Sequence, residues 1–196
     1  DLTPEWQKIR KVIDPATLEY AEYESASFPC LDAAKKAKTL PEKMQAVVYG
    51  DDKGAQFAWK AVAHNLIYAA NRIPEISDTI VEIDNALKWG FNFEMGPFET
   101  WDAIGLAKSI EKMENDGMAV PPKVKKMLAA GNTAFYKSEN GKHFYYDFAG
   151  ESYKERVISE NIISLASLKA TAKIVKENSS ASLIDLGDDV FCLELH

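Results

Sequence analysis

The feature that most constrains this chain is the break at Gly96-Pro97, inside an aromatic stretch spanning residues 83–105. Upstream of the break, apolar residues recur at helical spacing over residues 80–87, and Gly90 is expected to end that helix in the left-handed conformation. Downstream, Pro97 suits the first position of a new helix, because its missing N–H group costs nothing there. The stretch therefore predicts two helices joined by a short aromatic loop.

The helix predicted after the break has an acidic residue near its start and an apolar side. Glu99 lies in its first turn, where the helix dipole favours a negative charge. Phe98, Trp101 and Ile104 fall on one side of the helix, which predicts that this side is buried.

The whole stretch resembles the C-terminal helical domain of the 3-hydroxyacyl-CoA dehydrogenase family. A looser likeness extends over residues 50–135, and Trp89 and Trp101 resemble residues of the long bacterial and archaeal proteins that fuse this dehydrogenase to an enoyl-CoA hydratase. The residues that carry the resemblance form one unbroken run: Ile83, Asp84, Ala86, Gly90, Phe91, Phe93, Met95, Gly96, Pro97, Phe98, Glu99, Asp102, Ile104 and Gly105.

The resemblance implies a mainly α fold, a helical bundle like the C-terminal domain of 6-phosphogluconate dehydrogenase. It implies NAD-dependent oxidation of a (3S)-3-hydroxyacyl-CoA in fatty-acid β-oxidation by the intact multifunctional enzyme. In that family the catalytic histidine and its glutamate belong to a separate NAD-binding domain. We therefore expect no catalytic residue, bound cofactor or metal ligand in this chain, and expect NAD, acyl-CoA and the hydratase domain as partners of the intact protein.

Helical periodicity and punctuation by glycine and proline organise most of the chain. Residues 52–73 carry apolar side chains around nearly the whole circumference, which is typical of a central helix, and Pro74 ends it. Thr79 and Glu82 have the spacing of a capping box. Helices are predicted over residues 3–13, 31–38, 41–49, 52–73, 79–89, 97–104, 106–115 and 121–130.

The pattern changes to strands after Gly131. Asn140-Gly141 suits a tight hairpin turn between aromatic segments 134–138 and 142–148. Residues 160–169 are ambiguous and hold one or two helical turns, and residues 176–182 are interpreted as a linker. The terminal segment 182–196 predicts a strand pair that resembles the start of a crotonase-type domain. Those strands lack sheet partners, and such unpaired edges favour pairing with a neighbouring chain.

These patterns divide the chain into four parts. We expect an N-terminal connector with short helices, a dehydrogenase-type helical domain, a hairpin with its connector, and a linker leading into a crotonase-type domain. Their respective ranges are 1–50, 51–131, 132–175 and 176–196.

Composition excludes several classes of function. The net charge of −7 disfavours nucleic acid and anionic lipid, and no apolar run reaches the ~18 residues of a membrane span. Cys30 and Cys192 lack metal-ligand spacing and are interpreted as reduced, buried thiols of a cytoplasmic protein. Lys123, Lys125 and Lys126 form a basic cluster, interpreted either as the solvated side of a helix or as a contact for coenzyme A phosphates.

The motifs of hydride transfer are missing from the sequence. No G-x-G-x-x-G is present to let backbone N–H groups approach a dinucleotide. His64 is interpreted as a core histidine, His143 as a surface residue of the hairpin, and His196 as terminal. The three histidines have no metal-ligand rhythm.

One motif of the family is absent at its expected place. The helical domain normally begins with G-F-x-x-N-R, whose asparagine reaches the acyl substrate. In this chain Gln56-Phe57 takes the place of the Gly-Phe pair, and Lys60-Ala61 takes the place of the Asn-Arg pair. The sequence Asn71-Arg72-Ile73 looks like the motif but lies too near the end of the helix to take its role. The departure implies a second, degenerate helical repeat that shapes a domain interface.

Four carboxylates near the break are candidate acids: Asp84, Glu94, Glu99 and Asp102. A pair of them has the chemistry for acid–base catalysis, whereas capping of helix ends explains Glu99 and Asp102 more simply. Phe91, Phe93, Phe98 and Trp101 are interpreted as packing between helices.

Three functions fit these observations. The first is a helical domain that helps to close the acyl-CoA cleft and holds the domains of a dehydrogenase together. The second is a non-catalytic dimerisation or protein-interaction module, with a homodimer as one outcome. The third is an acyl-CoA-binding domain that acts alone, which lacks a convergent basic site.

Overall fold

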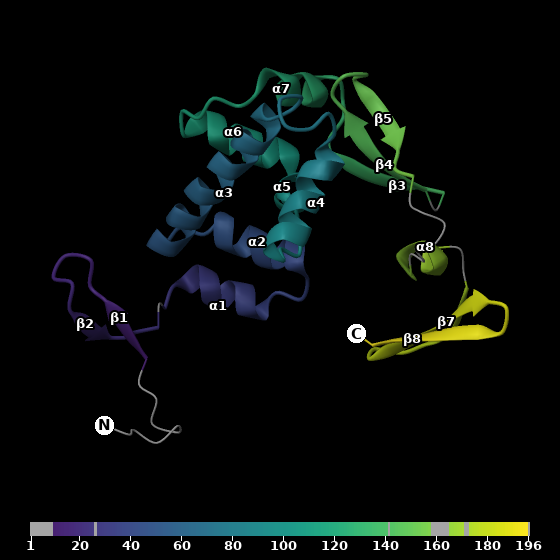
Figure 1. Cartoon of the computed structure of the whole chain (residues 1–196), viewed down its shortest axis with the longest axis horizontal. Coiled ribbons are helices and arrows are strands. Elements are labelled where there is room, and N and C mark those ends of the chain that lie inside the picture. The colour runs from purple at the N-terminus through teal and green to yellow at the C-terminus, as the bar shows by residue number, and fades with distance from the viewer. Residues whose placement is uncertain (1–9, 26, 141, 158–164, 171–172, 196) are drawn as a thin grey trace.

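A computed structural model describes residues 10–25, 27–140, 142–157, 165–170 and 173–195. Within these residues the chain is mainly helical, as expected, and carries three small antiparallel sheets where one hairpin and a terminal strand pair were predicted. Figure 1 shows α1–α7 and β3–β5 in one body, with β1 and β2 on one side and α8 with β6–β8 on another. The helices are α1 Pro29–Lys36, α2 Leu40–Val48, α3 Lys53–Asn71, α4 Ile80–Phe91, α5 Pro97–Ile104, α6 Leu106–Asn115, α7 Pro122–Ala129 and α8 Leu165–Ala170.

Polar side chains cap the starts of α2, α3 and α4. Thr39 and Glu42 form a reciprocal capping box at α2, and the Asp52 carboxylate caps α3 by accepting from the Ala55 N–H. At α4 the Thr79 hydroxyl accepts from the Glu82 N–H, which is one of the two bonds of the predicted capping box. The Thr79 N–H donates to the hydroxyl of Ser77.

One hydrophobic core unites α2–α7 with the strands β3 and β4. Phe98 and Trp101 of α5 are fully buried and pack on Phe135, with ring centroids 5.0 and 5.4 Å apart. Ile110 and Met113 of α6 point inward, as predicted. The buried residues of this core include Val48, Trp59, Leu66, Ile80, Phe98, Trp101, Ile104, Met113, Val124, Met127, Phe135 and Tyr146.

The predicted hairpin is part of a three-stranded sheet. Strands β3 Tyr136–Glu139 and β4 Lys142–Asp147 pair as the turn signal indicated. A third strand, β5 Ser152–Glu155, which the sequence pattern did not indicate, pairs with the other edge of β4. This sheet covers α5 through Tyr146, Phe148 and Phe135.

The terminal strands are more extensive than predicted. Strand β6 Ile174–Glu177 pairs with β7 Ala181–Gly187, so the prediction of a linker over residues 176–182 is wrong. Strand β8 Val190–Leu195 completes the sheet, and α8 packs on β7. The expected turn at residues 187–189 is present, because Gly187, Asp188 and Asp189 all have positive φ angles.

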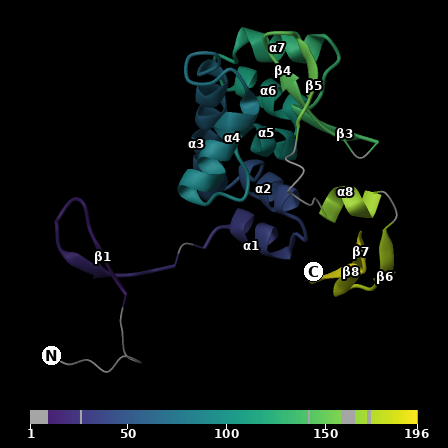
Figure 2. The ribbon, with the colours of Figure 1, turned by 45° about the vertical axis from the view of Figure 1, so that its right-hand side comes forward.

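The N-terminal prediction also needs correction. Lys11–Ile13 form β1, which pairs with β2 Tyr20–Glu22 in an exposed hairpin, so these residues are not helical. Residues 3–9 of the helix predicted over residues 3–13 lie outside the described residues, as do residues 160–164 of the ambiguous segment. Figure 2 shows the hairpin extending away from the helices in a second view.

Helix α3 is not buried all round. Its inner side, which includes Trp59 and Leu66, joins the core, but Phe57 is 77% exposed and Tyr68 is largely exposed too. Alanines let the inner side pack closely, whereas the outer side keeps Phe57 exposed and places only the Arg72 guanidinium over the ring of Tyr68. None of the helices in the described ranges is long and apolar enough to cross a membrane.

Candidate functional site

The aromatic stretch divides at its centre into an exposed half and a buried half. Helix α4 continues through Gly90 to Phe91, and Asn92 takes the left-handed conformation with φ of 57°. Gly90 therefore does not end the helix, because Asn92 tolerates this conformation through its short polar side chain. A loop then leads to Gly96, and α5 starts at Pro97 as predicted.

The Asp84 carboxylate holds the start of α5 from the neighbouring helix. It accepts hydrogen bonds from the Phe98 N–H at 2.8 Å, the Glu99 N–H at 3.2 Å and the Tyr136 hydroxyl at 2.7 Å. Two otherwise unpaired N–H groups of the first turn are satisfied in this way. Burial raises the pKa of Asp84 to about 6, although its hydrogen bonds favour the charged form.

Gly96 is required by the closeness of this contact. A Cβ atom at Gly96 would lie 2.3 Å from the Cα of Asp84, well inside any real contact. Glu99 closes the turn on the other side, because its carboxylate accepts from the Gly96 N–H at 2.9 Å and pairs with Lys88 at 2.5 Å. The interpretation of Glu99 as a helix cap is confirmed.

Asp102 joins α5 to the three-stranded sheet. Its two oxygens accept from the N–H groups of Phe135 and Tyr136 at 2.7 and 2.8 Å. Burial raises the pKa of Asp102 to about 7, and the charges of Asp84 and Glu99 act in the same direction. Asp102 thus caps the backbone at the start of a strand, and not the end of a helix.

Asp84 and Asp102 therefore meet through Tyr136, which the sequence did not indicate as important. Within the described residues, these two carboxylates accept hydrogen bonds from four backbone N–H groups and one tyrosine hydroxyl. Asp84 is 1% exposed, so a substrate has no route to it. The cluster is best explained as a structural link between α4, α5 and β3. Glu94 lies apart from it, on the loop.

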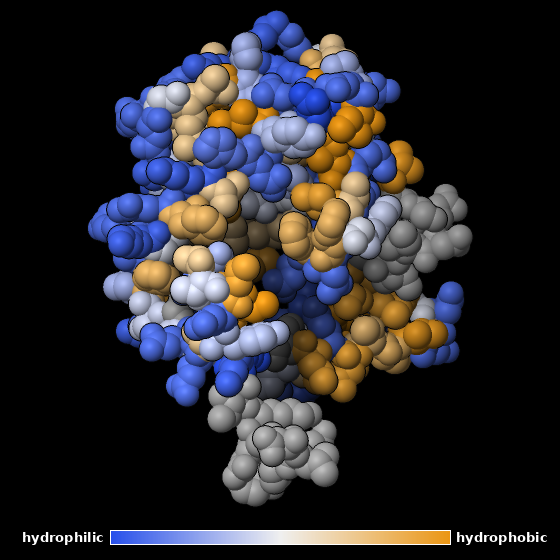
Figure 3. Space-filling model, turned by 60° about the vertical axis from the view of Figure 1, so that its left-hand side comes forward, coloured by the Kyte–Doolittle hydropathy of each residue, from blue (hydrophilic) through white to orange (hydrophobic). Residues whose placement is uncertain are grey.

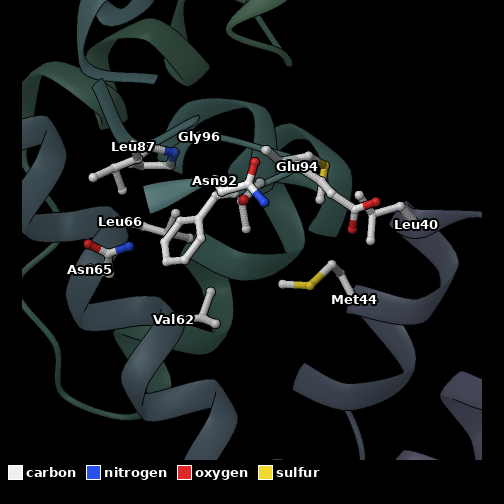
Figure 4. A pocket seen from close by; sticks show the side chains of 13 residues that line it. Leu40, Met44, Val62, Asn65, Leu66, Leu87, Asn92, Glu94 and Gly96 are labelled. Carbon is white, nitrogen blue, oxygen red and sulfur yellow. The ribbon is translucent and has the colours of Figure 1, made fainter. Parts of the chain in front are cut away.

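An apolar groove lies between α3 and α4, both of which pack against α5. It has two parts, of about 360 and 480 Å³, and both parts are lined by Asn65, Leu87 and Pro97. Figure 4 shows Val62 and Leu66 of α3 in the first part, with Leu40 and Met44 of α2 opposite Asn92 and Glu94 of the loop. The second part is lined by Tyr68, Ala69, Arg72, Ile76, Ser77, Glu82, Ile83 and Ala86.

The first half of the aromatic stretch, on the last turn of α4 and in the loop that follows, is exposed. Trp89 and Phe91 are 78% and 70% exposed, and Phe93, which lines the groove, is half exposed. The interpretation of Phe91 and Phe93 as packing between helices is wrong for the described chain, although it holds for Phe98 and Trp101. Figure 3 shows apolar side chains around a hollow on one face of the molecule.

The histidines do not form a site. His64 is exposed and bonds to the Lys60 carbonyl, so its interpretation as a core residue is wrong. His143 is partly exposed on β4 and bonds to the Ser138 hydroxyl at 2.8 Å. His196 lies outside the described residues. Among the described residues no group of three potential ligands is placed to hold a metal ion.

The lysine cluster makes contacts within the protein. Lys123 donates to the Ile73 carbonyl, and Lys125 pairs with Glu114 at 2.5 Å. Lys126 pairs with Glu151. These contacts favour the interpretation of the cluster as a solvated helix side over a phosphate site.

The residues that stand where the family has its G-F-x-x-N-R motif do not line the groove. Gln56, Phe57, Lys60 and Ala61 all lie on the exposed side of α3, and Asn71 is exposed at its end. Asn65 instead occupies the groove, and the sequence pattern did not indicate it.

The two cysteine thiols are not bonded to each other. Cys30 is buried, and its thiol donates to the Asp52 carboxylate at 3.3 Å, whereas Cys192 is partly exposed on β8.

Fold and site together define a mainly helical domain with a structural carboxylate cluster and an apolar groove. Residues 57–146 match the model of the 3-hydroxyacyl-CoA dehydrogenase C-terminal domain. A probable 3-hydroxyacyl-CoA dehydrogenase of Bacillus subtilis (strain 168) is 48% identical over 186 residues, covering 94% of this chain and 23% of that relative. No solved structure matches the chain. Residues 57–146 are therefore identified as a C-terminal domain of the 3-hydroxyacyl-CoA dehydrogenase family.

The match includes the structural elements that build the site. Residues 57–146 run from the first turns of α3 to strand β4 and include Asp84, Gly96 and Asp102. The chain spans about a quarter of the length of the Bacillus relative.

Proposed function

We propose that this chain is the helical part of a multidomain, cytoplasmic 3-hydroxyacyl-CoA dehydrogenase that acts in fatty-acid β-oxidation. In the intact enzyme, NAD oxidises a (3S)-3-hydroxyacyl-CoA to the 3-oxoacyl-CoA. The helical part helps to close the acyl-CoA cleft and holds the NAD-binding domain and a fused hydratase domain together. It does not catalyse the reaction alone.

The observation that carries this proposal is the family match over residues 57–146. The relative's name supports dehydrogenase activity for a protein about four times as long as this chain. The motif that produces the resemblance has a structural role here, because Asp84 and Gly96 fix the connection between α4 and α5. A domain stabilised in this way is suited to position other parts of an enzyme.

The described residues do not fit a dinucleotide. The sequence lacks G-x-G-x-x-G, and the described sheets are antiparallel, whereas such sites use a glycine-rich turn after a strand of a parallel sheet. We therefore assign no step of hydride transfer to these residues.

The terminal sheet supports the proposed contact with a further domain. One face of β6–β8 is covered by α8, where Ile184 is fully buried. On strand β8, Phe191, Leu193 and Leu195 alternate along the strand and remain largely exposed. An apolar strand face of this kind is typical of a surface that another domain covers.

The first experiment is an assay of the purified chain with acetoacetyl-CoA and NADH. We expect no oxidation of NADH above background, while the full-length enzyme turns over under the same conditions. Turnover by the isolated chain would contradict the proposal that catalysis belongs to other domains.

The second experiment tests the role in the cleft, using the full-length enzyme with Leu87→Glu in the groove. If this domain helps to close the acyl-CoA cleft, KM for acetoacetyl-CoA rises severalfold while KM for NADH is unchanged. Ala107→Glu, at an exposed position of α6 that does not line the groove, serves as the matched control. Equal kinetic constants for both variants and the wild type would contradict the proposal that this domain helps to close the acyl-CoA cleft.

A second candidate, a non-catalytic dimerisation or protein-interaction module, is favoured by one observation. The aromatic residues Trp89 and Phe91 are exposed on the last turn of α4, and Phe93 of the following loop lines the apolar groove. Calorimetric titration of the chain with acetyl-CoA separates the candidates, because a pure interaction module has no response to coenzyme A ligands.

A further inference from the structure

The hairpin of β1 and β2 extends away from the helical body, as Figures 1 and 2 show. We call residues 10–23 the arm. Its register pairs Val12 with Ala21 and Ile13 with Tyr20, and all four side chains are exposed. Apart from each other, β1 and β2 have no extensive contact with a described helix or strand. A two-stranded hairpin of this kind is marginally stable at best in water, so the arm is expected to need another surface to pack on.

Three apolar side chains of the arm lie at its tip. Ile13 and Tyr20 face each other across the hairpin and are 54% and 71% exposed. Leu18, in the turn between them, is 77% exposed and has a φ angle of 60°, a left-handed conformation that glycine or asparagine adopts more readily than leucine. An exposed leucine on a strained backbone gives this chain no stability. The tip therefore has the character of a contact surface for another part of a protein.

The area of the tip decides which kind of partner fits. Three side chains of this size expose on the order of 400 Å², about half of the roughly 800 Å² that a stable interface between separate proteins buries on each partner. Such a contact is too small for a second copy of this chain. It is sufficient inside one polypeptide, because linkage gives the two surfaces a high effective concentration. The Bacillus relative is about four times as long as this chain, so a protein of that size has ample other surface.

We propose that the arm packs on the NAD-binding domain of the intact enzyme and buries Ile13, Leu18 and Tyr20 in an apolar patch of that domain. The inference rests on the proposed function, in which this chain is one part of a multidomain dehydrogenase, and it names the segment that makes one of the contacts. Figure 1 shows the arm and the terminal sheet β6–β8 on different sides of the helical body. A hydratase domain that covers the terminal sheet therefore leaves the arm to the NAD-binding domain.

The charges of the arm specify the edge of that patch. Residues 10–25 carry four acidic side chains and two basic ones. The basic residues, Arg10 and Lys11, lie at the base of the arm, where the Arg10 guanidinium is 5.0 Å from the ring centroid of Tyr23. The tip has no basic residue, and Glu19 is exposed there. We therefore expect lysine or arginine side chains at the edge of the apolar patch on the NAD-binding domain.

Hydrogen exchange of the peptide that covers residues 10–23 tests the inference, in the full-length enzyme and in this chain alone. We expect exchange in the arm to be about tenfold slower in the full-length enzyme. Leu18→Asn keeps the left-handed turn and removes the apolar side chain. In this chain alone it should leave the exchange unchanged or slower, whereas in the full-length enzyme it should speed the exchange about tenfold. Equal exchange of the wild-type arm in both proteins overturns the inference.

The matched control is Val157→Asn, which removes an apolar side chain that is 88% exposed and lies outside the arm. It should leave the exchange of the arm unchanged in both proteins. If it speeds the exchange in the full-length enzyme as much as Leu18→Asn does, the protection does not come from the tip and the inference is overturned.

Photo-crosslinking identifies the partner surface, with p-benzoylphenylalanine introduced at Tyr20 of the full-length enzyme. We expect a cross-link to a peptide of the NAD-binding domain in the same polypeptide. A cross-link to the hydratase domain, or to a second polypeptide with a doubling of mass, overturns the inference. NADH oxidation with acetoacetyl-CoA is measured on the wild-type enzyme in parallel. An inactive enzyme overturns the proposed function, whereas an active enzyme with an unprotected arm overturns this inference alone.

Discussion

The two halves of the aromatic stretch have similar compositions and opposite environments. Trp101 and Phe98, after the break at Gly96, are fully buried, whereas Trp89 and Phe91, before it, are largely exposed. The difference comes from the turn that Asp84 fixes, because its carboxylate directs the first turn of α5 into the core. The comparison shows that one half of a recognisable motif specifies the fold and the other half specifies a surface.

The largest difference between the halves is expected from replacing their tryptophans. Trp101→Ala opens a cavity in the core and breaks the bond from the indole N–H to Ser109, so we expect a loss of about 3–5 kcal/mol in the free energy of unfolding. Trp89→Ala is expected to change it by less than about 0.5 kcal/mol. Urea denaturation, at protein concentrations too low for association, measures both. Similar losses for the two variants would mean that Trp89 is buried in solution.

The two glycines that flank the loop offer the next contrast. Gly96→Ala brings a Cβ within 2.3 Å of the Asp84 backbone, which cannot move without breaking the turn, and we expect a loss of about 3 kcal/mol. Gly90→Ala meets no atom within 4 Å and lies inside α4, so alanine should stabilise the helix by about 0.5–1 kcal/mol.

Thermal unfolding of the two glycine variants beside the wild type is sufficient to measure this contrast. A stable Gly96→Ala protein would show that Asp84 does not hold the turn as closely as the contact requires. Destabilisation by Gly90→Ala would show that the exposed half is also tightly packed.

The local part of this arrangement could be predicted from the sequence. Gly96-Pro97 and the spacing of Phe98, Trp101 and Ile104 gave the start and the buried side of α5, because helix starts and periodicity are local properties. Strands β1 and β6 were missed, since each has only three or four residues and most of them are exposed, so no alternation marks them.

The long-range part could not be predicted. Tyr136 bonds to Asp84 across 52 residues, and no local pattern relates them. His64 was misplaced for a similar reason: an apolar helix suggested burial on every side, but whether its outer side is covered depends on elements elsewhere in the fold. The groove likewise is lined by residues of α2, α3 and α4 and of the loop before α5, and no local pattern relates these segments.

The buried half should also respond to pH. The pKa values of Asp84 and Asp102, about 6 and 7, lie above the ordinary 3.8, so the folded chain keeps protons that the unfolded chain releases between about pH 4 and 7. Their contribution to the free energy of unfolding is therefore fully present below about pH 4 and is lost as the pH rises through 6 and 7. Between about pH 5.5 and 8, where only the last part of this loss falls, we expect a decrease on the order of 2 kcal/mol.

Denaturant unfolding between about pH 5.5 and 8 measures the decrease. Asp102→Asn removes one titrating group and should reduce the pH dependence, even though it also loses a backbone hydrogen bond. An unchanged slope in this variant would mean that Asp102 is charged throughout, with its two N–H donors outweighing its burial.

The smallest expected effect comes from Tyr136→Phe, which removes only the hydroxyl that donates to Asp84 at 2.7 Å. That bond favours the charged carboxylate, so its loss should raise the pKa of Asp84 further. We expect a loss of about 1 kcal/mol at pH 8, where the carboxylate is charged, and a smaller one at pH 5.5, where it is largely protonated. Tyr145→Phe, on the paired residue of β4, is the control, since the Tyr145 hydroxyl has no hydrogen bond to the described residues. Equal losses at both pH values would show that Tyr136 stabilises the sheet by packing alone and leaves the charge on Asp84 unaffected.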